Sequence, residues 1–309
     1  MKIKVFDIRD KEAFGTGEYS VLLGRFDGVH IAHQRLVKRA ITETPYKTAV
    51  FTFLEPGEEY ITKIGEKFEI FDKLGVSAIF LAPFNYVKRL SPEEFFEKVL
   101  VKIGCKVAIC GFNYRFGSEA AGDSNTLSEL CDRYGIRCIV DSPFIDNGEV
   151  VSSTLIRKYI REGNVARAEE LLGRPVRVTG SIIHGYERAR TMGYPTINML
   201  YPEGGVLLRH GVYATICEVK GTLYSGVTNV GTNPTLPKNT LTIETHLIGA
   251  SGDFYGVDTR VHFLEFLRDS VKCNSLEELS AIIENDKKKA VYFHEERARK
   301  GKGPFGFMK

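Results

Sequence analysis

The sequence lacks most of the features that mark secreted, membrane-spanning and nucleic-acid-binding proteins. Its six cysteines include no C-x-x-C pair, which argues against a zinc site and a disulfide framework and predicts reduced thiols. Its longest apolar runs, such as residues 78–84, are too short to span a bilayer. Its 42 basic and 39 acidic residues leave a net charge of +3, too balanced to indicate a nucleic acid or a membrane surface as partner. Because residues 1–7 also lack the apolar stretch of a secretory signal, we expect a cytoplasmic protein.

The sequence does have an ordinary globular composition, and the pattern of its hydrophobic residues differs between its two halves. With 309 residues, 43% hydrophobic and 26% charged, it is long enough for a sizeable core and two domains. In residues 1–174, short apolar runs alternate with helical patterns. Strands are predicted at 21–24, 47–53, 77–84, 106–112 and 136–141, and helices at 33–41, 66–75, 91–104, 125–135 and, as two short ones, in 152–173. Ser91, Pro92 and Glu94 form the capping pattern that begins one of these helices.

This alternation predicts βαβ units and a parallel sheet, whose ligands bind beyond the carboxyl ends of the strands. Residues 24–33 and 111–117 both lie at such ends. After residues 173–175 the rhythm changes to β-rich stretches separated by Gly, Asn and Pro turns, which predicts an antiparallel barrel or sandwich. A final helix begins with a capping pattern at Ser275 and Glu278. We therefore place one domain at 1–174 and a second at 175–309.

His30 and His33 stand where the first of the predicted helices begins, directly after a strand and an Asp-Gly turn. Zinc requires three or four ligands, and this pair supplies only half a site with no Cys, Asp or Glu cluster nearby. The imidazoles also fit a packing role inside a helix junction. A phosphate site is the third interpretation, because a helix N-terminus offers N–H groups and the positive end of the helix dipole. The residues alone favour phosphate over metal and leave the packing role open.

The whole stretch 23–36 resembles the opening of bacterial bifunctional riboflavin kinase/FAD synthetases, with H-x-x-H in place of the HxGH motif of nucleotidyltransferases. Further motifs of that family follow in the family's order. They are a second nucleotide loop at 111–123, an SSTxIR-like signature at 152–157, a PTxN-like motif within 193–199, and a strand with an acidic residue at 243–248 followed by 253–256. The resemblance implies a Rossmann-like nucleotidyltransferase domain, then an antiparallel β-barrel riboflavin kinase domain with a terminal helix.

For the first domain, the resemblance implies a site that transfers the adenylyl group of ATP to FMN. His30 and His33 would contact the ATP phosphates and stabilise the transition state. Further residues would shape the nucleotide pocket or hold phosphates and Mg²⁺, namely Gly24, Phe26, Asp27, Asn113, Ser153, Thr154 and Arg157. Taken alone, residues 152–157 also fit an ordinary helix cap with a solvated arginine.

For the second domain, the resemblance implies a site that phosphorylates riboflavin. Thr196 and Asn198, which share one side of an extended segment, would contact Mg²⁺ and the phosphates, and Glu244 would be the base. Gly193 belongs to the implied phosphate loop, and Arg268 would lie near the flavin. Without the resemblance, Glu244 equally fits an outward-facing strand carboxylate.

Three departures from the family pattern surround the first site. Arg25 stands where the family has a small residue, Ala32 where it has Gly, and no His follows Pro56. They leave three hypotheses: a bifunctional enzyme of FMN and FAD synthesis, a riboflavin kinase with a weakened or inactive adenylyltransferase domain, and a flavin- or nucleotide-binding regulator without turnover. Intact Thr196, Asn198 and Glu244 argue against the regulator. We expect riboflavin, FMN and ATP as substrates, Mg²⁺ as cofactor, and neither nucleic acid nor membrane as partner; the sequence predicts no oligomeric state.

Overall fold

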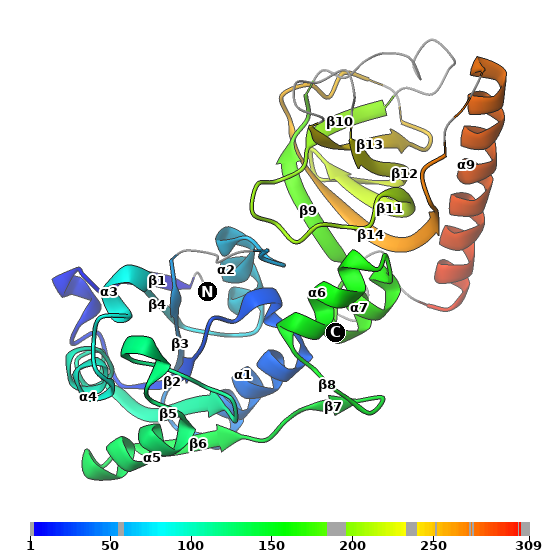
Figure 1. The fold of residues 1–309 in the computed structure, drawn as a ribbon. Coiled ribbons are helices and arrows are strands. Elements are labelled where there is room, and N and C mark those ends of the chain that lie inside the picture. The colour runs from blue at the N-terminus through cyan, green and yellow to red at the C-terminus, as the bar shows by residue number, and fades with distance from the viewer. Residues whose placement is uncertain are drawn as a thin grey trace. The chain divides into compact units, whose positions relative to one another are not determined.

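The structure is a computed structural model, and it describes residues 3–54, 59–183, 196–232, 240–250, 252–271, 273, 275–301 and 303. The chain divides into two compact units, Met1–Ser153 and Thr154–Lys309 (Figure 1). In the part of the chain that the structure describes, no helix has the length and apolar composition needed to cross a bilayer.

The first unit is built on a six-stranded parallel sheet in the order β1-β4-β3-β2-β5-β6. Its central strands are continuous apolar runs, because both faces of a parallel sheet are covered. The strands are β1 (Lys4–Asp7), β2 (Tyr19–Leu23), β3 (Lys47–Phe53), β4 (Ala78–Ala82), β5 (Cys105–Gly111) and β6 (Arg137–Asp141). The strand order reverses between β2 and β5, so the loops after these two strands flank the crevice where ligands of such sheets bind.

Helices cover both faces of this sheet (Figure 1). One face packs against α1 (Ile31–Glu43) and α2 (Ile64–Lys73). The other packs against α4 (Pro92–Phe95), its π-helical continuation η3 (Phe96–Val101), and α5 (Ser124–Arg133). The predicted capping box is confirmed, since Ser91 Oγ accepts from Glu94 N at 3.1 Å and Glu94 Oε2 accepts from Ser91 N at 3.0 Å. Shorter elements are η1 (Lys11–Ala13), η2 (Asp27–Val29), α3 (Phe84–Val87), η4 (Ser118–Ala120) and the hairpin β7 (Ile145–Asp146) with β8 (Glu149–Val150).

The second unit is built on a six-stranded antiparallel sheet in the order β10-β13-β12-β11-β14-β9. Ile183, just after β9, bridges Asn198 of β10, so the two edge strands meet and the sheet curls into a barrel. The strands are β9 (Val176–Ser181), β10 (Thr196–Leu200), β11 (Gly211–Val219), β12 (Thr222–Thr232), β13 (Leu241–Leu247) and β14 (Asp258–Arg268). The predicted fold class, a parallel α/β domain followed by an antiparallel barrel, is confirmed.

The terminal helix α9 (Leu276–Arg299) runs alongside the barrel (Figure 1). It begins as predicted at Ser275, whose hydroxyl accepts from Glu278 N at 3.1 Å. Its Ala290 packs with Val212, Ala214 and Val227 of the sheet. One face of β11 and β12 is therefore apolar and covered by this helix.

The compact units meet at Ser153/Thr154, whereas the change of rhythm predicted a boundary after residue 174. The segment between carries α6 (Ser153–Arg161) and α7 (Val165–Leu172). Helix α7 packs against β9 and β14 of the barrel. Its Glu169 accepts both guanidinium Nη groups of Arg297 of α9 in a buried ion pair. The segment continues the helical pattern of the first half of the sequence, but its helix α7 packs against elements of the second unit.

Candidate active sites

The turn that joins β2 to α1 is strained. Phe26 has φ 50° and Val29 has φ 40°, in the left-handed region that side chains avoid, and Gly28 has φ 78°. Such backbone costs on the order of 1–3 kcal/mol per residue, most for a β-branched side chain, and persists only where its surroundings fix it. This turn lies at the carboxyl edge of the sheet, where a ligand site is expected.

Asp27 fixes the middle of the turn. Its carboxylate, in a residue only 2% exposed, accepts from Ile61 N at 3.0 Å and from Thr62 N at 3.3 Å. Its carbonyl oxygen accepts from Ser153 Oγ at 2.9 Å. Asp27 therefore ties the turn to the segment before α2 and to the start of α6, and its role in shaping a nucleotide pocket stays a prediction.

Arg25 fixes the start of the turn through its backbone. Its carbonyl oxygen accepts from Thr52 Oγ1 and from Lys67 Nζ, each at 3.0 Å. Its exposed guanidinium lies over the rings of Phe53 and Phe84, 5.8 and 5.5 Å from their centroids. The side chain that departs from the family pattern is therefore held against two aromatic rings at the carboxyl edge.

His30 and His33 are brought together at the start of α1. His30, 4% exposed, is the residue that precedes the helix, and His33 lies in its first turn. Their rings stack at a centroid distance of 3.5 Å and an interplanar angle of 18°. Phe26 meets the His33 ring edge-on at 5.0 Å, and a Cβ added to Gly24 would lie 3.2 Å from the Phe26 ring. The predicted residues Gly24 and Phe26 therefore act as packing supports of the histidine pair.

The surroundings of the stacked histidines are relevant to whether they bind a metal ion, bind phosphate or only pack. Among the described residues, no group of three or more His, Cys, Asp or Glu side chains is arranged to hold a metal ion. The first amide groups of α1 have no partners within the helix and carry the positive end of its dipole. Two imidazoles beside such an end can donate hydrogen bonds to phosphate oxygens.

The loop after β5 lies on the other side of the point where the strand order reverses, between β2 and β5. Asn113 is exposed there, and its Oδ1 lies 3.5 Å from the Cβ position of Gly111. The loop closes on itself through a bridge between Phe116 and Gly122, where a Cβ on the glycine would lie 2.7 Å from the phenyl ring. The glycine of this motif is therefore required by packing, and it shapes the loop that carries Asn113.

Ser153, Thr154 and Arg157 all lie in the first turns of α6. Ser153 is tied to the β2–α1 turn by its hydrogen bond to Asp27. Thr154 is exposed and Arg157 is half-buried, and both belong to the second compact unit. Their predicted role in holding pyrophosphate stays a prediction.

In the second unit, the strand register brings the predicted kinase residues together. Asn198 of β10 lies directly opposite Glu244 of β13, and Thr196 lies opposite His246. Residues directly opposite each other in antiparallel strands share a face. Residues two apart in one strand also share a face, as the sequence predicted for Thr196 and Asn198. The Asn198 amide nitrogen lies 3.5 Å from both the carbonyl and the hydroxyl oxygen of Thr196.

Glu244 is a half-buried carboxylate within this row. Burial raises its pKa above the usual value, and a hydrogen bond from the Thr242 hydroxyl opposes that rise. A general base is most effective when its pKa lies nearer the working pH, so the shift suits the predicted role of Glu244. The Cβ–Cβ separation of facing strand residues, about 4.5–5.5 Å, brings Asn198 close to it.

Asn229 and Lys67 were missed by sequence reasoning. Asn229 of β12 lies directly opposite Glu244 on the other side from Asn198, which makes a row of amide, carboxylate and amide across three strands. A short sequence motif cannot predict the register between strands that are distant in the sequence. Lys67, 1% exposed under the β2–α1 turn, reads in the sequence as an ordinary helix lysine.

Gly193, with the loop 184–195, lies outside the described residues, as do Pro56 and residue 57. Arg268 ends β14 and forms an ion pair with the buried Asp286 of α9, with Nε 2.9 Å from Oδ1 and Nη2 2.6 Å from Oδ2. The arginine therefore anchors the terminal helix to the barrel, and its proximity to a flavin stays a prediction.

Fold and sites together define a two-domain enzyme that joins a nucleotidyltransferase-like α/β unit to a barrel bearing a half-buried carboxylate between two amides. Residues 15–155 match the family model for FAD synthetase, and residues 172–293 match that for riboflavin kinase. The chain belongs to the family of bifunctional riboflavin kinase/FMN adenylyltransferases, which confirms the resemblance drawn from its motifs.

The relatives match along most of their length. The chain is 32% identical over 279 residues to the bifunctional riboflavin kinase/FMN adenylyltransferase of Listeria monocytogenes, covering 85% of this chain and 88% of the relative. It is 31% identical to the enzyme of the same name from Bacillus subtilis, covering 88% and 91%. A crystal structure titled a macrolide-efflux protein from Streptococcus pneumoniae has the same fold, with a TM-score of 0.82, 29% identity, and 93% and 98% coverage.

Proposed function

We propose that the chain carries out two consecutive reactions, the phosphorylation of riboflavin to FMN in its barrel and the adenylylation of FMN to FAD in its α/β unit. The observation that carries this proposal is the pair of family matches, which divide one chain between both activities. The stacked histidines at α1 and the row around Glu244 give each unit side chains suited to its reaction.

In the kinase reaction, Glu244 accepts the proton of the ribityl 5′-hydroxyl as that oxygen attacks the γ-phosphorus of ATP. The bond from this phosphorus to the β–γ bridging oxygen breaks, and ADP leaves. Its raised pKa favours proton acceptance near neutral pH. Asn198 and Thr196 would hold Mg²⁺, because amide, hydroxyl and carbonyl oxygens are ligands that this ion prefers, and these groups lie together in the row. When bound, Mg²⁺ neutralises charge on the transferred phosphoryl group.

In the adenylyl transfer, a phosphate oxygen of FMN attacks the α-phosphorus of ATP and pyrophosphate leaves. No side chain has to form a covalent bond, so positioning and charge stabilisation supply the catalysis. His30 and His33 donate to phosphate oxygens beside the positive end of α1. Asn113 would contact phosphate or Mg²⁺ from the other side of the crevice.

A riboflavin kinase with a weakened adenylyltransferase is the second candidate. The observation that favours it is the Arg25 guanidinium, which occupies the carboxyl edge over Phe53 and Phe84. Ala32, in the first turn of α1, places a methyl group beside the same site.

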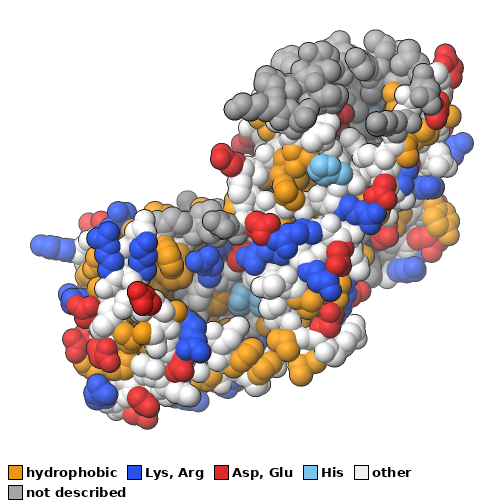
Figure 2. Space-filling view, in the orientation of Figure 1, with side chains coloured by type: hydrophobic (Ala, Val, Ile, Leu, Met, Phe, Trp, Pro, Cys, Tyr) orange, Lys and Arg blue, Asp and Glu red, His pale blue; other side chains and the backbone are white. Residues whose placement is uncertain are grey.

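Riboflavin, FMN and ATP are the proposed small-molecule partners, and the cytoplasm is the proposed location. All six cysteines are free thiols, which is typical of a reducing compartment. Figure 2 shows basic and acidic side chains interspersed over the visible face, without a large patch of one sign. Such a surface suits small-molecule substrates.

One assay tests the proposal. The purified full chain is incubated with riboflavin, ATP and Mg²⁺, and the flavins are separated by chromatography. We expect FMN followed by FAD. FMN alone would support the second candidate, whereas unchanged riboflavin would overturn the enzymatic role. A parallel incubation with FMN and ATP isolates the second reaction.

A further inference from the structure

Lys67 is a buried lysine beneath the strained turn of the first unit. It lies on the inward face of α2 beside Ile70 and Phe71, and it is 1% exposed. Lysine is almost never fully buried without a partner, because removing an ammonium group from water is costly. Its partners here are the Arg25 carbonyl oxygen, 3.0 Å from Nζ, and the nearby charge of Asp27.

The hydrogen bond from Lys67 acts where the backbone leaves its ordinary conformation. Arg25 immediately precedes Phe26, the first residue of the turn with a positive φ. Lys67 Nζ and Thr52 Oγ1 both donate to this carbonyl and so fix the plane of the peptide between Arg25 and Phe26. The Phe26 side chain leaves the backbone directly after this peptide, and its ring meets the His33 ring at 5.0 Å.

We propose that Lys67 is a positioning residue of the adenylyltransferase site, whose ammonium group holds the turn that presents His30 and His33 to phosphate. The inference rests on the proposed adenylyl transfer. Lys67 acts on the histidines indirectly, through Arg25 and Phe26. No step of the kinase reaction involves it, because that site lies in the other unit.

The charge on Lys67 gives this role a pH dependence. Burial lowers the pKa of the ammonium group to about 8, with the Arg25 charge lowering it and the Asp27 charge raising it. These two groups face it from the turn, Glu66 is its neighbour on α2, and β3 presents the uncharged Thr52. Above pH 8 the group becomes a neutral amine and a weaker donor, so FAD formation should decline there while FMN formation does not.

The test compares Lys67→Met with Lys73→Met, an exposed lysine on the same helix, in the full chain. Lys67→Met should lower kcat for FAD formation from FMN and ATP at least tenfold and abolish the decline of this reaction near pH 8. The rate of FMN formation should not change, and Tm should be equal to or higher than that of the wild type. Lys67→Arg keeps a charged donor, so it should restore much of the activity and move the decline to higher pH. Lys73→Met should match the wild type.

Each other outcome is decisive. Wild-type kcat and pH profile in Lys67→Met would overturn the inference while leaving the proposed adenylyl transfer intact. Loss of FMN formation and a lower Tm in both Lys67 variants would show a structural role and would also overturn it. A wild-type chain that makes FMN but no FAD would overturn the adenylyl transfer itself, and the role of Lys67 with it.

Discussion

At the scale of single residues, both units use groups whose burial changes their chemistry. Glu244 is half-buried with a raised pKa, and Lys67 is buried with a lowered one. Burial disfavours the charged form in both cases, so each group exchanges its proton nearer neutral pH than it would in water. We therefore expect each group to add a pH dependence to one reaction and not to the other.

Replacing Glu244 by Gln should lower kcat for FMN formation at least about 100-fold, because the amide cannot accept the ribityl proton. FAD formation from supplied FMN should persist. Both rates are measured by chromatography of the flavins on one protein preparation. Equal loss of the two activities would contradict the assignment of Glu244 to the barrel reaction alone.

The same substitution has a consequence for stability whose sign follows from the raised pKa. The folded chain binds a proton on Glu244 more tightly than the unfolded chain, whose carboxyl keeps a pKa near 4.5. This carboxylate therefore lowers the free energy of unfolding as the pH rises from 4.5 through the raised pKa. Glu244→Gln should have a higher Tm than the wild type at neutral pH, with the difference shrinking in acid.

At the scale of elements, the register of β10, β13 and β12 makes the kinase row. Asn229→Asp would set a second carboxylate opposite Glu244, and two like charges on facing strands raise each other's pKa. The acid limb of FMN formation should therefore move to higher pH. Asn229→Ala, which removes the amide without adding charge, is the matched control and should leave the limb in place.

Identical pH profiles of FMN formation in the Asn229→Asp and Asn229→Ala chains would contradict the placement of Asn229 beside Glu244. His246 lies on the same face of β13 and is a second titratable side chain of the row. The comparison is therefore repeated in a His246→Gln chain. A shift that survives there belongs to Glu244.

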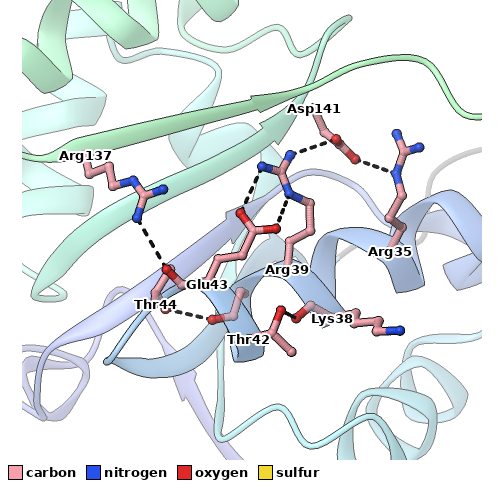
Figure 3. A network of polar contacts seen from close by, with 9 residues as sticks. Arg35, Lys38, Arg39, Thr42, Glu43, Thr44, Arg137 and Asp141 are labelled. Atoms are coloured by element: carbon pink, nitrogen blue, oxygen red, sulfur yellow. Dashed lines mark hydrogen bonds and ion pairs between the residues drawn. The ribbon is translucent and has the colours of Figure 1, made fainter.

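A polar network anchors helix α1, which carries the histidine pair, to the edge of the sheet (Figure 3). Asp141 at the end of β6 is 7% exposed and accepts from Arg35 Nε at 2.8 Å and from Arg39 Nη1 at 2.9 Å. Arg35 also donates to the Ser142 carbonyl and lies over the Phe144 ring at 4.8 Å. One carboxylate thus joins two arginines of α1 to the strand that ends beside them.

Asp141→Asn should lower the free energy of unfolding by about 1–3 kcal/mol, since it leaves the partly buried guanidinium of Arg35 without its anion and removes one of the two carboxylates that bind Arg39. Urea unfolding followed by circular dichroism measures the change. Glu43→Gln removes the other carboxylate of the network, which is exposed, and should have little effect. An Asp141→Asn chain as stable as the wild type would mean that the network does not hold α1.

The elements that could be predicted from the sequence are those with a strong local pattern. The apolar run of residues 47–53, which forms β3, and the capping box at Ser91 appear in the structure as predicted. Strand β1 and the β7–β8 hairpin were missed, because two to four residues contain too little periodicity to identify a strand. β1 forms by pairing with β4, which is distant in sequence, whereas β7 and β8 pair only with each other across a short turn.

The sites could be predicted to the extent that a local motif carries them. His30, His33, Thr196, Asn198 and Glu244 lie within short ordered motifs. Two further residues depend on tertiary structure. Lys67 is buried only because α2 packs under the turn, and Asn229 faces Glu244 only because of the register between β12 and β13. Neither relation can be read from spacing along the chain.

At the scale of the whole molecule, two units with separate sheets carry two reactions that share FMN as product and substrate. Each unit has its own buried core, and the histidine pair and the row around Glu244 each lie within one unit. Glu244→Gln and His30→Ala should therefore disable different reactions. His30→Ala removes one phosphate donor and should lower FAD formation about 100- to 1,000-fold while FMN formation continues.

The independence of the units predicts that these two variants complement each other when mixed. Given riboflavin, ATP and Mg²⁺, the His30→Ala chain makes FMN, which dissociates and is adenylylated by the intact α/β unit of the Glu244→Gln chain. FAD should appear after a lag, because FMN must first accumulate in solution, and raising the concentration of the His30→Ala chain should shorten that lag. Each variant alone is the control and should give almost no FAD. A mixture that accumulates FMN without FAD would show that adenylyl transfer needs both intact units in one chain, and the two sites would then act as a single catalytic assembly.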